Sequence, residues 1–310
     1  MRKQITEWRI YVGPERDDTI TAAVQAAGAR VVDEPDTADA FVWLSPSTTD
    51  LSNSLHPDVE WVQLKSAGID HLLRSGLVDD RRHWTGARGA YAGAVAEHGL
   101  TLMLAAARRL HEILPARDWG EPGTRFGHVL AGACVGIVGC GAIGRSLIDL
   151  LDPFETRVLA VTRSGQPVAG AAETVTPAHA DAVVARSDFL VLSAPATPET
   201  VGFMDRRRLA LMPRSAWLVN IGRGDLVITD DLVEALEGRS IGGAALDVTD
   251  PEPLPDDHAL WKAPNAIITP HTANPPETNS VTLADRVVEN LLRFEQGAPL
   301  LGTIDVARGY

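Results

Sequence analysis

Three polar residues in the second half of the chain could together perform acid–base chemistry on a carboxylic acid. Arg223 follows the apolar run WLVNIG, Glu252 lies in the loop DVTDPEP, and His271 follows AIITP. An imidazole can donate a proton near neutral pH, a carboxylate can orient it, and a guanidinium can hold a substrate carboxylate. Together the three groups would suffice for the reduction of a 2-oxo acid. Taken singly, each could instead be a surface arginine, a solvated carboxylate or a structural histidine.

A glycine pattern between an expected strand and an expected helix indicates a dinucleotide site. The pattern G-x-G-x-x-G lies within CVGIVGCGAIGRSLIDLL, and its members are Gly139, Gly141 and Gly144. The first glycine permits a tight turn, the second lets the backbone approach a pyrophosphate, and the third lets the helix pack closely on the strand. The pyrophosphate would lie at the helix N-terminus, near Ala142 and Ile143. Glycine-rich turns also occur for structural reasons, so the flanking strand and helix support this interpretation.

The turn Thr162-Arg163-Ser164 predicts a preference for NADP(H) over NAD(H). In a Rossmann site the residue about 20 positions after the glycines faces the adenine ribose 2′ position. An acid there would repel a 2′-phosphate, and this turn contains none. Arg163 offers a planar cation, and both hydroxyls can donate to phosphate oxygens. If Arg163 instead points into solvent, cofactor use would be relaxed and NAD(H) would also serve.

Alternating strands and helices predict the fold class, α/β with two Rossmann-like domains. Several expected strands are apolar throughout, as in doubly wound parallel sheets covered on both faces. Ligands bind such sheets at the carboxyl ends of the strands, where the three polar residues lie. We expect a substrate domain over residues 1–94, an inserted dinucleotide-binding domain over 95–277, and a C-terminal helix within 278–310 that returns to the first domain. A long helix over 95–113 precedes an arm broken by proline and glycine.

The composition argues against several classes of partner. The 310 residues are 45% hydrophobic and carry a formal net charge of -13. This charge argues against nucleic acid or an anionic membrane as the main partner, and no apolar run is long enough to span a bilayer. Two cysteines, Cys134 and Cys140, lie in and just after an expected core strand, and MRKQITEWRIYVG at the N-terminus is not typical of a signal peptide. We therefore expect a cytoplasmic protein without disulfides, and no metal site is predicted.

Eight ordered motifs resemble the D-isomer-specific 2-hydroxyacid dehydrogenase family. They are LKSAGIDHL, VAEHGLTLML, VGIVGCGAIG, SAPATPET, LVNIGRGDLV, ALDVTDPEPLP, ITPHTA and TIDVARGY. The resemblance implies Arg223, Glu252 and His271 as catalytic residues, with the arginine and the histidine also contacting substrate. It implies that backbone N–H groups of Ala67 and Gly68 bind the substrate carboxylate, although from the residues alone this could be only a tight turn. It further implies cofactor contacts from Pro195, Ile221, Gly222 and Asp247, the aspartate at the nicotinamide carboxamide.

Within the family, the chain is most similar to the glyoxylate/hydroxypyruvate reductase branch. The expected activity is hydride transfer between NADP(H), with NAD(H) possible, and a small 2-oxo acid or D-2-hydroxy acid. Thr249 and Asn274 stand where an aromatic and a small residue are common in the family, which bears on the pocket's shape. The family works as dimers built through the cofactor domain. The apolar helix over 95–113 and Trp119 in the following arm fit a homodimer, because a partner would cover their apolar surface.

Other functions are consistent with parts of the same pattern. The chain could be a dinucleotide-sensing binding protein of the corepressor type, which shares this fold, or an NAD-dependent D-2-hydroxyacid dehydrogenase with another substrate. The retained arginine, glutamate and histidine favour catalysis, and a turnover assay separates these possibilities. Oxidation of formate or phosphite is a third possibility, and Glu252 argues against it, since formate enzymes of this family have glutamine at that position.

Overall fold

A computed structural model describes residues 3–120 and 126–306, and the chain divides into two compact units. Unit 1 comprises Met1–Tyr91 and Asn274–Tyr310, and unit 2 comprises Ala92–Ala273, so the second is inserted into the first. The boundaries expected from the sequence were 95 and 278. Residues 121–125 of the expected arm and the last four residues of the TIDVARGY motif lie outside the described residues.

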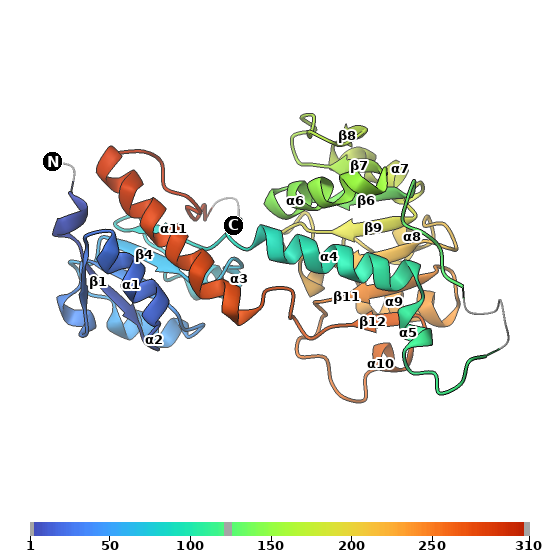
Figure 1. The fold of residues 1–310 in the computed structure, drawn as a ribbon, viewed down its shortest axis with the longest axis horizontal. Helices are drawn as coiled ribbons and strands as arrows, with labels where there is room; N and C mark the ends of the chain where they lie inside the picture. Colours follow the sequence, from blue (N-terminus) through green and yellow to red (C-terminus); the bar gives the residue numbers. More distant parts are fainter. Residues whose placement is uncertain (1–2, 121–125, 307–310) are drawn as a thin grey trace. The chain divides into compact units, whose positions relative to one another are not determined.

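Unit 1 is built on a five-stranded parallel sheet with the strand order β2-β1-β3-β4-β5 (Figure 1). Its strands are β1 (Arg9–Gly13), β2 (Arg30–Val32), β3 (Ala40–Trp43), β4 (Trp61–Leu64) and β5 (His83–Thr85). Its helices are α1 (Asp18–Ala26), α2 (Thr48–Ser54), α3 (Asp70–Ser75) and α11 (Pro276–Gln296). The C-terminal helix α11 packs against α1, and its Phe294 ring lies 4.9 Å from that of Trp8 and 5.2 Å from that of Trp61. The end of the chain therefore completes the core of unit 1.

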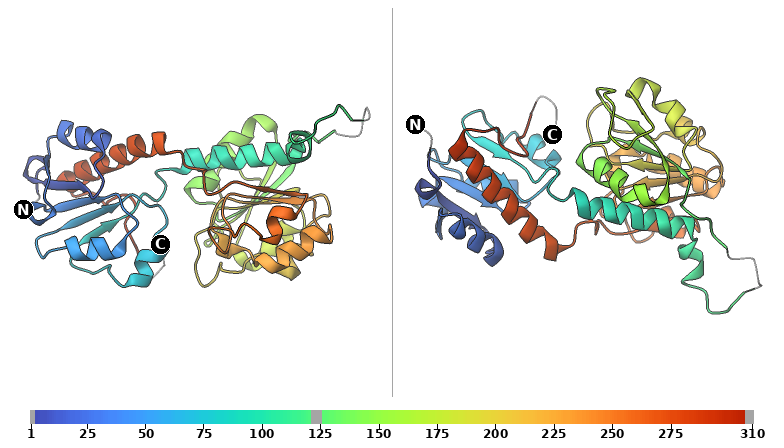
Figure 2. Two further views of the ribbon diagram at one scale, coloured as in Figure 1. Left: turned by 90° about the horizontal axis from the view of Figure 1, so that it is seen from below. Right: turned by 45° about the horizontal axis from the view of Figure 1, so that its top comes forward.

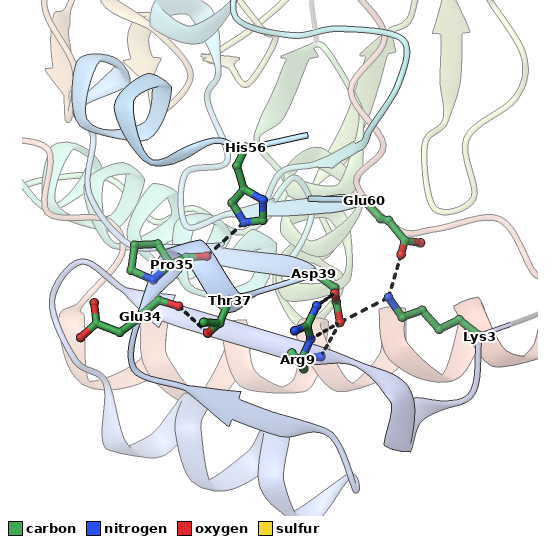
Figure 3. Close-up of polar contacts among 8 residues, drawn as sticks. All are labelled: Lys3, Arg9, Glu34, Pro35, Thr37, Asp39, His56 and Glu60. Atoms are coloured by element: carbon green, nitrogen blue, oxygen red, sulfur yellow. Dashed lines mark hydrogen bonds and ion pairs between the residues drawn. The ribbon is translucent and has the colours of Figure 1, made fainter. Parts of the chain in front are cut away.

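A polar cluster fixes the start of β1 to the start of β3 in unit 1 (Figure 3). The Asp39 carboxylate is 10% exposed and accepts hydrogen bonds from the Arg9 backbone and guanidinium groups. Lys3 lies 3.5 Å from the same carboxylate and 2.7 Å from Glu60. Burial alone would raise the pKa of Asp39, but the hydrogen bonds from Arg9 and the charges of Lys3 and Arg9 lower it below its ordinary value.

Unit 2 is built on a seven-stranded parallel sheet with the order β12-β11-β10-β9-β6-β7-β8. Its strands are β6 (Cys134–Val138), β7 (Arg157–Val161), β8 (Glu173–Val175), β9 (Phe189–Leu192), β10 (Trp217–Asn220), β11 (Gly243–Leu246) and β12 (Ala266–Ile268). Its helices are α4 (Ala92–Ala107), α5 (Leu110–Ile113), α6 (Ala142–Leu151), α7 (Ala180–Val184), α8 (Arg206–Leu209), α9 (Thr229–Glu237) and α10 (Ala259–Lys262). The strand order reverses between β6 and β9, because β7 and β8 lie on one side of β6 and all later strands lie on the other, and open α/β sheets bind ligands at such a position.

Helices cover both faces of this sheet, as Figure 2 shows, and this explains why its strands are apolar on both sides. One core contains side chains of α4 and α6, among them Met103, Leu147 and Leu151. The other core contains side chains of α7 and α9, among them Val183 and Leu232. The prediction of an α/β protein with parallel sheets is therefore confirmed.

The prediction of a single helix over 95–113 is wrong, because the structure divides this stretch into α4 and α5. Arg109 has a left-handed backbone conformation with φ 54°, so the chain turns there. The residues around the turn are strong helix formers, so their helix propensity does not explain the break. Packing explains it, because after the turn the His111 ring lies 5.1 Å from the ring of Trp217 on β10, and Arg109 pairs with Glu112. Tertiary contacts override helix propensity here.

Candidate active site

The three glycines of the predicted dinucleotide turn differ in what surrounds them. Gly139 has φ +85°, and a Cβ there would lie 2.4 Å from the Cα of Ala194, so both conformation and space require glycine. A Cβ on Gly141 would have no neighbour closer than 4.0 Å, which leaves the turn open on that side. A Cβ on Gly144 would lie 3.0 Å from the Sγ of Cys140, so a side chain would press α6 away from the strand.

The start of α6 fits the diphosphate of a dinucleotide. Gly141 is the N-cap and has no side chain that could accept from the N–H groups of the first turn. The first bond in the helical pattern runs from the Arg145 N–H to the Gly141 carbonyl, at 3.0 Å. The N–H groups of Ala142, Ile143 and Gly144 therefore point out of the helix end, where the helix dipole favours an anion.

The loop after β9 brings the glycine turn close to the turn that contains Arg223. Ala194 contacts both turns, since a Cβ on Gly222 would lie 2.9 Å from the Ala194 carbonyl oxygen. Pro195 follows in this loop and is exposed, whereas Ile221 is buried beside α4. Four of the residues predicted to bind the cofactor (Gly139, Pro195, Ile221 and Gly222) thus lie in neighbouring turns at one edge of the sheet.

The turn predicted to select NADP(H) follows β7. Thr162 is half-buried, and Arg163 and Ser164 are exposed. The Thr162 and Ser164 hydroxyl oxygens accept hydrogen bonds from backbone N–H groups of the same turn, at 3.0 and 3.3 Å, and so hold its shape. A hydrogen bond from Thr197 and, more weakly, the charge of Arg163 lower the pKa of Glu199. Arg163 is therefore near enough to the loop after β9 to act on a charge there.

Arg223 lies in a turn that the buried amide of Asn220 holds in place. The Asn220 Nδ2 donates to the Arg223 carbonyl at 2.8 Å, and its Oδ1 accepts from the Gly222 N–H at 3.1 Å. A Cβ on Gly224 would lie 2.0 Å from the Thr249 carbonyl oxygen, so the backbones of these two loops touch. The loop with the catalytic arginine candidate is therefore fixed against the loop that leads to Glu252.

His271 and Glu252 form a hydrogen-bonded pair in the loops that follow neighbouring strands. The His271 Nδ1 lies 2.6 Å from the Glu252 Oε1, and the two side chains are 54% and 41% exposed. His271 has φ 52°, and its N–H donates to the Asp247 carbonyl at 2.9 Å. Because a carboxylate only accepts, Nδ1 carries the proton of this bond. Nε2 is then the nitrogen that can exchange a proton with a substrate.

Asp247 holds the loop after β12 through a carboxylate that is almost fully buried. Its Oδ1 accepts from the Thr269 hydroxyl at 2.6 Å and the Thr272 N–H at 2.9 Å, and its Oδ2 accepts from the Ala273 N–H at 3.1 Å. His98 lies 3.3 Å from Oδ1. Burial alone would raise the pKa of Asp247, but these hydrogen bonds outweigh it and lower the pKa. The carboxylate predicted to contact the nicotinamide carboxamide thus already has four protein donors.

Ala67 and Gly68 belong to unit 1, where they follow β4. Ala67 and Arg88 border the same small, open hollow in that unit. The remaining lining residues are Ile69, Gly86, Gly302 and Ile304. A backbone turn beside a cationic side chain is suited to an anionic group.

Sequence reasoning did not identify Asn220, His98 or Thr269. Asn220 is a polar residue at the end of the otherwise apolar strand β10, and this position was a usable signal. His98 lies in an apolar helix pattern, and its partner Thr269 is 171 residues later in the sequence, so no local pattern marks the pair. In the described part of the chain, no group of three or more histidine, cysteine, aspartate or glutamate residues could hold a metal, and no helix there is long and apolar enough to cross a membrane.

Comparison with known proteins decides the family. A model described as "D-isomer specific 2-hydroxyacid dehydrogenase, NAD binding domain" matches residues 100–273. The chain belongs to the D-isomer specific 2-hydroxyacid dehydrogenase family. This dehydrogenase is accordingly an NAD(P)-dependent enzyme, and the resemblance inferred from its motifs is confirmed.

Relatives of this dehydrogenase include proteins with and without a known activity. An uncharacterized protein in the proB 3′ region of Corynebacterium melassecola is 39% identical over 302 residues, 96% of this chain and 98% of the relative. Human glyoxylate reductase/hydroxypyruvate reductase is 33% identical over 250 residues, 77% and 75% of the two chains. The structure of the NADPH-dependent glyoxylate/hydroxypyruvate reductase of Sinorhizobium meliloti, in complex with NADP and sulfate, is 28% identical with a TM-score of 0.80, covering 98% and 100%.

Proposed function

We propose that this dehydrogenase reduces small 2-oxo acids of the glyoxylate and hydroxypyruvate type to D-2-hydroxy acids, with NADPH as the preferred reductant. The observation that supports it most is the 2.6 Å pair between His271 Nδ1 and Glu252 Oε1, together with the contact between the loop that leads to Glu252 and the turn that contains Arg223. A general acid and a carboxylate-binding cation thus stand on the unit that has the dinucleotide turn. The human and Sinorhizobium relatives are named for these two substrates.

Each residue of the proposed active site has a separate role in the reaction. The reduced nicotinamide, when bound, supplies the hydride for the C2 carbonyl carbon. His271 delivers a proton from Nε2 to the oxygen that becomes the alcohol, and Glu252 stabilises the positively charged ring. Arg223 pairs with the substrate carboxylate and stabilises negative charge on the carbonyl oxygen. The N–H groups of Ala67 and Gly68 are proposed to bind the same carboxylate.

The preference for NADPH rests on the turn after β7. Thr162, Arg163 and Ser164 include no acid that would repel a 2′-phosphate, and Arg163 is exposed at the tip of the turn. A charge-assisted hydrogen bond to the phosphate contributes roughly 1.5–3 kcal/mol. Each 1.36 kcal/mol corresponds to about a tenfold change in rate, so we expect a preference of about ten- to a hundredfold in kcat/KM. The Sinorhizobium relative is described as NADPH-dependent.

A substrate panel tests the proposed function. Glyoxylate, hydroxypyruvate, pyruvate, phenylpyruvate and branched 2-oxo acids would each be offered with NADPH and with NADH, and the loss of absorbance of the reduced nicotinamide would be followed. We expect glyoxylate or hydroxypyruvate to give the highest kcat/KM, and NADPH to exceed NADH. Absence of turnover with every acid, together with tight binding of the dinucleotide, would instead support a dinucleotide-sensing protein.

A homodimer is proposed on the apolar surface of the segment after α4. Leu114, Phe126 and Val129 are exposed there, and Trp119 is fully exposed. Isolated apolar residues at a surface need no explanation, but four in one segment indicate a covered face. Light scattering at micromolar concentration should give the mass of two chains, and a Trp119→Ser variant should weaken the association. A monomer in the wild type would contradict this proposal.

A further inference from the structure

We infer that His98 on α4 is a positioning residue for His271, and that it acts through Thr269 and Asp247. The inference rests on the proposed role of His271 as proton donor. His98 and His271 are on different elements of unit 2, and the connection between them consists of hydrogen bonds within that unit.

The direction of each hydrogen bond follows from the chemistry of the partners. The Thr269 hydroxyl lies 2.6 Å from the Asp247 Oδ1, and a carboxylate can only accept, so the hydroxyl donates its one proton there. The His98 Nε2 lies 2.9 Å from the Thr269 Oγ1 and 3.3 Å from the Asp247 Oδ1. Both of these atoms can only accept from it. His98 must therefore carry its proton on Nε2, and it donates toward both oxygens.

Asp247 connects this donor to the histidine loop. Its carboxylate accepts from the N–H groups of Thr272 and Ala273, the two residues after His271, and its carbonyl accepts from the N–H of His271 itself. Three successive N–H groups of the loop thus bond to one residue. His271 has φ 52°, a conformation that a residue with a side chain keeps only when its surroundings determine it. The orientation of the Asp247 carboxylate therefore determines where the His271 ring lies.

The burial of this network makes His98 hard to replace by water. The Asp247 side chain is 2% exposed and that of His98 is 19% exposed. A buried carboxylate that loses a donor must find another or turn away, because leaving the oxygen unpaired is costly. Turning would release the Thr272 or Ala273 N–H and move the ring of His271 from the Glu252 oxygen. Misplacement of a reacting group by about 1 Å can reduce a rate as much as a hundredfold.

Kinetics of matched variants test the inference. His98→Leu removes the donor, His98→Gln keeps an amide N–H at a similar reach, and Thr269→Val removes the hydroxyl at nearly constant volume. Thr101→Val is the control, since Thr101 lies on the same helix and its hydroxyl bonds only to the carbonyl of its own helix at Glu97. The readouts are kcat and KM with the best 2-oxo acid, the dissociation constant for NADPH from its fluorescence, and the thermal midpoint.

We expect His98→Leu and Thr269→Val each to lower kcat roughly tenfold, as for loss of one orienting hydrogen bond. NADPH binding, to which Asp247 is also predicted to contribute, should weaken less than kcat falls. His98→Gln should recover most of kcat, and the double variant should be no slower than either single variant, because both act through one carboxylate. Wild-type kcat in His98→Leu, equal loss in His98→Gln and His98→Leu, or multiplied losses in the double variant would each overturn the inference. If His98→Leu does not fold, Thr269→Val decides by the same criteria.

A wild type that reduces no 2-oxo acid would refute the proposed function and this inference together. An active wild type with an unaffected His98→Leu variant would refute the inference alone.

Discussion

Replacing Glu252 by glutamine should lower kcat/KM for 2-oxo acid reduction about fivefold. In the proposed reaction His271 delivers its proton from a positively charged ring. The carboxylate 2.6 Å from Nδ1 stabilises that charge, and glutamine keeps the hydrogen-bond acceptor but removes the charge. The variant therefore stabilises the proton-donating form of the ring less well.

The exposure of the pair sets the size of this change. Two unit charges about 4 Å apart attract by about 1 kcal/mol in water and by about 4 kcal/mol at an effective dielectric constant of roughly 20. His271 and Glu252 are 54% and 41% exposed, so the value in water is the appropriate one for the free enzyme. Since each 1.36 kcal/mol corresponds to about a tenfold change in rate, kcat/KM should fall about fivefold.

The assay is kcat/KM for reduction at one fixed pH and at several ionic strengths. Raising the salt concentration should shrink the difference between wild type and Glu252→Gln, since the pair is partly exposed. Thr101→Val, which changes no charge, should leave kcat/KM unchanged. An unchanged kcat/KM in Glu252→Gln, or a loss that is the same at every ionic strength, would remove the charge of the carboxylate from the mechanism.

Three further changes have defined outcomes. His271→Ala should lower kcat by ~10² or more, with NADPH binding by fluorescence nearly intact, because general acid catalysis contributes about that factor; a loss confined to binding would contradict this. Arg163→Ala should reduce kcat/KM with NADPH about ten- to a hundredfold and barely change it with NADH, whereas equal losses would show that this turn does not read the 2′-phosphate. Asp39→Asn should lower the free energy of unfolding at pH 7 by about 1–3 kcal/mol in urea titrations. Because folding lowers the pKa of Asp39, its contribution is present above about pH 4 and is lost as the pH falls further, so wild type and variant should converge in acid; a constant difference would refute this.

The parts of the fold that were predictable have local signals in the sequence. The strand, glycine turn and helix at residues 134–151 follow from an apolar run, a glycine spacing and an amphipathic pattern that adjoin one another. His271 and Glu252 could be paired because both follow strands of one parallel sheet, and such strands end at the same edge. The structure adds their distance, which no spacing in the sequence contains.

The parts that were not predictable depend on distant contacts. The turn at Arg109 is determined by packing against β10. The strands β5 and β8 are too short to show an alternating pattern of apolar and polar residues. Thr229 begins α9, and its hydroxyl donates outside the helix to the carbonyl of Asp250, in the loop that leads to Glu252. His98 could not be identified because its partners follow it by about half of the chain. Local propensity therefore locates elements, and long-range packing determines which side chains meet.

The completion of unit 1 by the last helix has a consequence for how the protein is made. During synthesis, β1 to β5 leave the ribosome before unit 2, and α11 emerges only after it. Until then the Trp8 and Trp61 rings lack Phe294, and the buried amide of Gln63 lacks its Asn290 donor. Unit 2 is continuous in sequence and can fold as soon as it is complete, whereas the N-terminal segment must wait with apolar surface exposed. A chain truncated before α11 should therefore retain a folded unit 2 and be cut by proteases within its first 91 residues.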